Sequence, residues 1–405
     1  MIMGLETTLH KTGQPTRISN RGGRNSNVEV LRILAMFLIL INHFPWNLEN
    51  IVGHGSYLER LPLDLVVALA TNFGGVGDCL FFFISIWYLC EESPSLKRSC
   101  KRAWILEREL LFWSLTLFAV FLAVTALHAT EPVSAKTFLR YAAQAFFPTA
   151  TNHWWFPTSY ILFLLICPAL CEGLRRIGRD VHYSLAIIST VVFGLVPFGC
   201  MNQLFHSWNM TYSVWLFVYQ FVLVSYLRWY KKDWLDNTRM MTASAWIGLA
   251  LGVFSQIAIV SAALMFKEST TLCVFWMNCP AALPSMMVAI GLIALAQRKA
   301  PRHNRMVNEI ASSVFTVYLI LTDGFANSVI DDFIKGLDMT GWMLLLISFL
   351  LACGFFVLAV HLGFIRQGLF AVTVDRNRGH WFELVWDKAM ERIERGEHKR
   401  SNAKA

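Results

Sequence analysis

The sequence predicts an all-α integral membrane protein, with about ten transmembrane helices and both termini in the cytoplasm. Hydrophobic residues make up 56% and charged residues 15% of the 405 positions, and the mean hydropathy is +0.48. These values lie outside the range of soluble globular chains. The apolar residues form repeated runs of about 20 residues, the length that crosses a hydrocarbon core of about 30 Å. The distribution of positive charge is the third observation.

Ten apolar runs define the predicted spans. They cover residues 28–48, 65–90, 109–128, 153–172, 183–200, 212–229, 243–265, 275–296, 308–329 and 341–365.

The positive charges alternate across these spans as an inside–outside pattern requires. Of the 35 Lys and Arg residues, only Arg60, Lys136, Arg140, Lys267 and Lys335 fall in the segments predicted to lie outside. This asymmetry places both termini in the cytoplasm and explains the net charge of +8. We therefore expect contact with anionic membrane lipid and no nucleic-acid partner.

Three segments make up the predicted domain organisation. Residues 1–27 lack apolar periodicity and are expected to form a disordered cytoplasmic tail without a secretory signal. Residues 28–367 form the transmembrane domain. Residues 368–405 form a basic cytoplasmic tail, in which apolar residues from Phe382 to Ile393 recur at the spacing of an amphipathic helix.

The nine cysteines do not form a metal-binding pattern, and no metal is expected. Cys79, Cys90, Cys167 and Cys353 lie within or at the ends of predicted spans, where a free thiol behaves as a small apolar group. Near the outer face, Cys273 and Cys279 could pair in an oxidising compartment, and their spacing leaves both states open.

The first span carries two ionisable residues, Arg32 and His43, inside an otherwise apolar run. Eleven residues of α-helix place them on nearly the same face, about 16 Å apart along the axis. Arg32 then lies near the cytoplasmic end and His43 near the outer end. Such groups are either functional or simply interfacial, with the Arg side chain extending to the headgroups.

Other polar residues in the spans are candidates for the same interior. In the second span Asp78 should point into the bundle, where hydrogen bonding and catalysis are both open roles. His153, Trp154 and Trp155 are placed at the outer interface, the depth of an aromatic belt. Tyr318 and Asp323 fall in the outer half of the ninth span, where they could line the cavity of His43.

The inner segment before the third span is strongly basic. Lys101, Arg102 and Arg108 could hold the phosphates of a cytoplasmic ligand, since Arg grips phosphate in a bidentate manner. Membrane topology alone would also produce such a cluster.

Several of these motifs occur together in an order that resembles membrane-bound acyltransferase family 3, whose members O-acylate surface polysaccharides and related glycans. The resemblance covers about residues 27–370. Its motifs are the Arg and His of the first span, Phe81–Phe82 with Ser85, Trp155–Phe156, the VYLI stretch at residues 317–320 and IRQGLF at residues 365–370.

The resemblance implies an O-acyltransferase that uses acyl-coenzyme A, with acetyl-CoA as the expected donor. His43 would be the general base for an acceptor hydroxyl, and Arg32, oriented by Glu29 one helical turn earlier, would position the donor. Lys101, Arg102 or Arg108 would hold its phosphates. The acceptor would be a cell-surface polysaccharide or a lipid-linked sugar precursor.

The residue that stabilises the oxyanion is not distinguished by the resemblance; Tyr318, Asn42 and Ser85 are the candidates. The expected location is a bacterial plasma membrane, as a multi-pass protein. The oligomeric state leaves no signal in the sequence.

Two positions depart from the family pattern. Ile86 stands where the family usually has Gly, and Leu321 follows the VYLI stretch where many members have His. His43 therefore carries more of the expected catalysis. The alternative reading is a lipid or glycan transporter without chemistry, whose key ionisable groups would be expected near mid-membrane depth.

Overall fold

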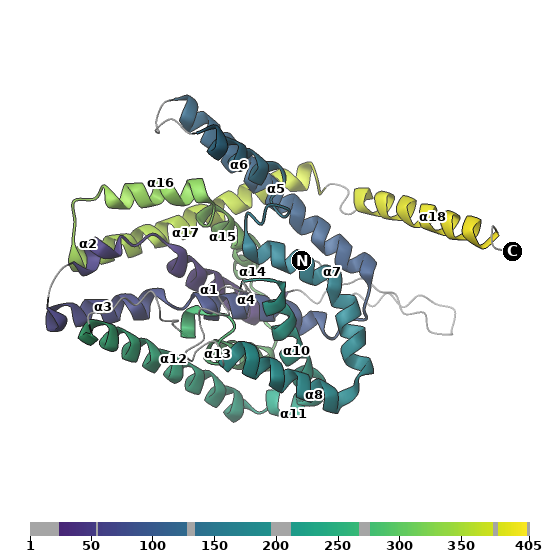
Figure 1. Ribbon diagram of the computed structural model, residues 1–405, viewed down its shortest axis with the longest axis horizontal. Helices are drawn as coiled ribbons and strands as arrows, with labels where there is room; N and C mark the ends of the chain where they lie inside the picture. The colour runs from purple at the N-terminus through teal and green to yellow at the C-terminus, as the bar shows by residue number, and fades with distance from the viewer. Residues whose placement is uncertain are drawn as a thin grey trace.

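The computed structural model describes residues 24–53, 56–127, 134–195, 212–266, 276–375 and 380–402. Every regular element within these ranges is a helix (Figure 1). In order, they are α1 (Ser26–His43), α2 (Leu48–Val52), α3 (Tyr57–Thr71), α4 (Gly74–Leu89), α5 (Leu96–Ala126), α6 (Ala135–Phe146), α7 (Trp155–Arg176), α8 (Gly178–Ser189) and the π-helical turn η1 (Thr190–Leu195).

The second half continues with α10 (Val214–Tyr230), α11 (Lys232–Leu235), α12 (Thr238–Phe266), the 3-10 turn η4 (Trp276–Asn278), α13 (Leu283–Arg298), α14 (Arg305–Ser313), α15 (Phe315–Leu321), α16 (Gly324–Lys335), α17 (Gly341–Val372) and α18 (His380–Asn402). The all-α class expected from the sequence is confirmed.

Six stretches among the described residues are long and apolar enough to cross a membrane, and a bent pair of helices raises this number to seven. The six are Ser26–His43, Leu58–Leu89, Leu96–Ala126, Trp155–Arg176, Thr238–Phe266 and Gly341–Val372. Helices also lie at the other predicted positions, but α10 and α13 have only 17 and 16 residues. The protein is thus a multi-helix membrane protein, and ten spans with cytoplasmic termini stay a prediction.

Two predicted spans are not continuous helices. The second is interrupted at Asn72 and Phe73, between α3 and α4. The ninth is divided among α14, α15 and α16, and its last part turns by 77° after Leu321. The turn has a local cause, because the side chain of Asp323 accepts hydrogen bonds from the backbone N–H groups of Phe325 and Ala326 and so starts a new helix.

The segment boundaries also shift. Helix α1 begins at Ser26, capped by the side chain of Asn25, so the end of the predicted N-terminal tail is helical. Residues 1–23 lie outside the described ranges. Helix α17 continues to Val372, beyond the expected domain end at residue 367, and the predicted C-terminal tail contains helix α18.

The buried thiols match the expectation for apolar cysteines. Cys79, Cys90 and Cys167 are buried and unpaired, and Cys353 is partly buried. Cys279 is likewise a free, buried thiol. Cys273 lies outside the described residues.

The centre of the bundle is the contact between α1 and α4, with α13 packed against both. A Cβ atom at Gly77 of α4 would lie 2.7 Å from the carbonyl oxygen of Ala35 and 2.8 Å from the Ile39 side chain. Glycine here permits the two backbones to approach closely, as small residues do in membrane helix pairs. This contact positions the helix that carries Arg32 and His43.

Candidate functional site

Helix α1 presents Arg32 and His43 along one continuous element, as the spacing predicted. The Arg32 Nε atom lies 3.1 Å from Glu29 Oε2, one helical turn away, and both side chains are largely buried. The guanidinium also lies over the ring of Phe81, 5.8 Å from its centroid. Glu29 therefore lies where it can orient the Arg32 guanidinium, and the opposite charges of the two groups compensate each other in a buried setting.

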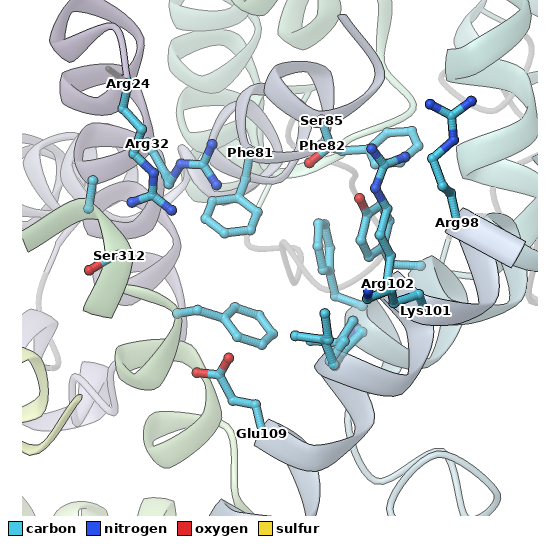
Figure 2. A pocket seen from close by; sticks show the side chains of 17 residues that line it. Arg24, Arg32, Phe81, Phe82, Ser85, Arg98, Lys101, Arg102, Glu109 and Ser312 are labelled. Carbon is cyan, nitrogen blue, oxygen red and sulfur yellow. The ribbon is translucent and has the colours of Figure 1, made fainter. Parts of the chain in front are cut away.

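Arg32 lines a cavity of about 420 Å³ enclosed by α1, α4, α5, α7, α14 and α15. Five cationic side chains face it: Arg24, Arg32, Arg98, Lys101 and Arg102. Figure 2 shows Arg24 and Arg32 on one side of the cavity and the three cations of α5 on the opposite side. Residues far apart in sequence thus meet around one space.

Among the described residues that line this cavity, Glu109 is the one with a carboxylate. It lies 3.1 Å from Arg366 of α17, so its charge is already compensated. The excess of positive charge suits a ligand with several negative charges, and Arg and Lys both bind phosphate well.

Some of these cations are held in place by neighbouring acceptors. Arg102 makes two hydrogen bonds to Glu92, at 2.7 and 2.8 Å. Arg98 donates to the backbone and side chain of Ser93. Lys101 contacts Glu383 of α18 at 2.8 Å. The three cations of α5 therefore all have protein partners in this structure.

The remaining wall is apolar and includes Phe81, Phe156 and Phe315, with Ser85 as a polar group between α4 and the cavity. Phe81 contacts both of the other rings: its centroid lies 5.9 Å from that of Phe156 and 6.0 Å from that of Phe315. Tyr318 lies on the next turn of α15, with its centroid 5.9 Å from Phe315 and 6.3 Å from Phe156.

His43 lies beyond this aromatic layer and does not line the cavity. Its ring centroid is 6.3 Å from that of Tyr318. Its Nδ1 atom is 2.9 Å from the carbonyl oxygen of Ile39. Because a carbonyl oxygen only accepts, Nδ1 donates the hydrogen, and the neutral imidazole then carries its lone pair on Nε2.

The other residues predicted for the site lie at several places around the cavity and His43. Asn42 packs against Gly74, and Asp78 is buried with one carboxylate oxygen lacking a hydrogen-bond partner among the described residues. Asp78 thus faces the bundle interior, as its charge requires. Trp155 packs against Phe156, Tyr212 and Phe217 and does not line the cavity.

His153 and Asp323 form a pair, although they are 170 residues apart. The His153 Nε2 atom lies 3.0 Å from Asp323 Oδ2, and both side chains are less than a tenth exposed. The neighbouring Trp154 donates from its indole N–H to the carbonyl of Leu319, at 3.1 Å. These two contacts attach the start of α7 to the segment that follows Tyr318, where α15 ends and α16 begins.

Sequence reasoning assigned one donor residue that the cavity does not include and missed others. Arg108 lies outside the lining and pairs with Asp375 at 2.9 Å. Arg24, Arg98 and Glu109 line the cavity without having been predicted as site residues. The signal for Arg98 was present in the basic segment, whereas Arg24 precedes the first span and had no local pattern to mark it.

A metal site was not expected from the sequence. Among the described residues, no group of three or more His, Cys, Asp or Glu side chains is arranged to hold a metal ion.

The fold and cavity define a multi-helix membrane protein with a cavity that five cationic side chains line. The chain belongs to acyltransferase family 3: a family model described as an acyltransferase domain matches residues 25–364. The protein is therefore a membrane acyltransferase by family. Comparison with curated proteins and with solved structures gives no match.

Proposed function

We propose that this protein transfers an acyl group, acetyl in the first instance, from acyl-coenzyme A to a hydroxyl of a cell-surface polysaccharide or its lipid-linked precursor. The observation that supports it most is the cavity of about 420 Å³, with five cations and a single, already paired carboxylate, inside a chain of the acyltransferase family. Coenzyme A carries a diphosphate and a further phosphate, which match this charge.

In this proposal the donor phosphates are bound from two sides of the cavity. Arg32 and Arg24 bind them from one side, and Arg98, Lys101 and Arg102 bind them from the other. The apolar wall then receives the pantetheine arm, whose thioester must pass the layer of Phe81, Phe156 and Phe315 to approach His43. The helical separation of Arg32 and His43, about 16 Å along the axis, is a distance that such an arm spans.

His43 acts as the general base. Its Nδ1 donates to the Ile39 carbonyl, so Nε2 accepts the proton of the acceptor hydroxyl while the hydroxyl oxygen attacks the thioester carbon. The new ester C–O bond forms, the C–S bond breaks, and the proton passes from His43 to the leaving thiolate. Among the three oxyanion candidates, Tyr318 has its ring in contact with that of His43.

The same proposal includes the topology. Ten spans with cytoplasmic termini in a bacterial plasma membrane would put the basic segment of α5, and with it the donor cavity, on the cytoplasmic side, where acyl-coenzyme A is made. His43 would then lie toward the outer side, where the glycan is presented.

The proposal is tested by measuring transfer of labelled acetyl from acetyl-CoA to surface glycan in membranes that contain the protein. We expect His43→Gln to lower transfer by about 10²–10⁴-fold, the contribution of a general base. Donor binding should stay near its original value, because His43 does not line the donor cavity.

His361 provides a matched control. Its Nδ1 atom makes the same contact with a carbonyl one helical turn earlier, that of Val357 at 2.7 Å, but it is exposed on α17. His361→Gln should leave transfer unchanged. Equal activity of His43→Gln and wild type would contradict the role of His43, and glycan movement that needs no donor would favour a transporter.

A further inference from the structure

The C-terminal helix α18 contacts a lining residue of the donor cavity through one carboxylate. Figure 1 shows α18 extending beyond the rest of the bundle, and its contact with the bundle includes α5. Glu383 Oε1 lies 2.8 Å from Lys101 Nζ, and Glu383 Oε2 lies 2.7 Å from Lys97 Nζ. A single carboxylate therefore bridges two lysines on successive turns of α5.

Only one of these two lysines belongs to the cavity. Lys101 lines it, together with Arg98 and Arg102 of the same helix, whereas Lys97 does not. Glu383 thus neutralises a cation that faces the space in which we place the donor phosphates. Hydrogen bonds from Lys101 and Lys97 lower the pKa of Glu383, so the carboxylate is ionised at neutral pH.

The contact is of a kind that a ligand can displace. The side chains of Lys101 and Glu383 are 33% and 36% exposed. Ion pairs with this exposure contribute little stability, because water screens them and two side chains lose freedom. A phosphate monoester, such as the further phosphate of coenzyme A, carries more charge than a carboxylate near neutral pH. Like a carboxylate, it accepts charge-assisted hydrogen bonds from an ammonium group.

We propose that Glu383 competes with a phosphate of the acyl-coenzyme A donor for Lys101, so that the C-terminal helix sets the affinity of the cavity for its donor. This inference rests on the proposed function. Donor binding removes Lys101 from Glu383, while Lys97 retains the carboxylate and keeps α18 attached to α5.

A neighbouring contact separates this competition from simple attachment of α18. Asp387, one turn further along α18, lies 3.1 Å from Lys97. Among the described residues, the ion-pair partner of Lys101 is Glu383 and not Asp387. Asp387 is more exposed than Glu383, at 63% of its side chain. A substitution at Asp387 therefore loosens α18 without releasing the cavity cation.

The test measures acetyl-CoA binding and its KM with the full chain in lipid nanodiscs, for wild type, Glu383→Gln and Asp387→Asn. We expect Glu383→Gln to lower the Kd and KM about two- to fivefold, the range that an exposed ion pair supports. Asp387→Asn should leave both unchanged. The difference should disappear in a Lys101→Gln background and shrink at high salt.

Each outcome decides a separate point. Binding by Glu383→Gln that equals or falls below that of wild type would overturn the competition, even if wild type binds acetyl-CoA and transfers acetyl. An equal gain from Asp387→Asn would assign the effect to attachment of α18. If wild type binds no acetyl-CoA at all, the proposed function itself fails, and this inference with it.

Discussion

Arg32 and His43 lie on the same helix but in two different surroundings. Arg32 lines the cavity beside the other cationic side chains and pairs with Glu29. His43 is separated from that cavity by aromatic rings and is fixed in one tautomer by the carbonyl of Ile39. In the proposed mechanism, one helix thereby holds the cation that would bind the donor and the base that would react at a constant spacing.

Arg32 gives the prediction at the scale of single residues. Arg32→Gln should raise the KM for acetyl-CoA about tenfold or more, since a hydrogen bond to a charged group contributes about 1.5–3 kcal/mol. The rate at saturating donor should fall far less than in His43→Gln. Steady-state transfer assays at varied acetyl-CoA concentration measure both.

Two further variants serve as controls for the effect of Arg32→Gln on the KM. Arg32→Gln leaves Glu29 buried without its partner, so the double variant Glu29→Gln/Arg32→Gln removes both charges and should show the same rise in KM. Arg176→Gln alters an arginine that is 77% exposed and paired with Glu172 on α7. An equal rise in KM from Arg176→Gln would show that the loss of any positive charge has this effect, and that Arg32 has no specific role in donor binding.

At the scale of elements, the sequence identified where helices lie better than where they break. Hydropathy marked residues 308–329 as one span, but the cap at Asp323 divides it. The side-chain oxygen of an Asp binds the first N–H groups of a helix more readily than it fits a helix interior. The bend in turn brings Asp323 to His153, a contact that no local pattern shows.

The contact between α1 and α4 leads to a prediction about packing. A Cβ atom at Gly77 would lie 2.7 Å from a backbone oxygen of α1, which cannot rotate away. Gly77→Ala should therefore lower the melting temperature in detergent, with a loss of about 1–3 kcal/mol for overpacking. Fluorescence-monitored thermal unfolding measures the shift.

The matched control is Gly354 in α17, where an added Cβ would meet nothing within 4 Å. Gly354→Ala should leave the melting temperature unchanged or raise it, because alanine favours a helix over glycine. If both alanine variants melt at the temperature of wild type, the close approach of α1 and α4 does not limit the stability of the protein.

At the scale of the whole molecule, the uneven distribution of Lys and Arg predicts which segments face the cytoplasm. Lys136 of α6 falls in a segment predicted to lie outside, and Arg179 of α8 falls in one predicted to lie inside; both are exposed. Cysteine at position 136 should react with a membrane-impermeant maleimide in intact cells. Cysteine at position 179 should react only after permeabilisation.

The native chain, with its nine cysteines, sets the background for this labelling. Reaction of both positions in intact cells, or of neither, would place them on the same face. The ten-span arrangement and the cytoplasmic donor side would then both be wrong.

The sequence by itself determined that the chain is a bundle of membrane helices and that Arg32 and His43 share one of them. Hydropathy, helical period and charge are local properties, so they can be read along the chain. It also selected Lys101, Arg102 and Ser85, which the structure brings to one cavity with Arg32.

Only the tertiary structure decided which of these groups meet. It removed Arg108 from the cavity, added Arg24 and Arg98, and joined His153 to Asp323 across 170 residues. It also brought Glu383 of the C-terminal helix to Lys101. Such contacts depend on how helices pack against one another in space, and the local sequence around each residue does not specify that packing.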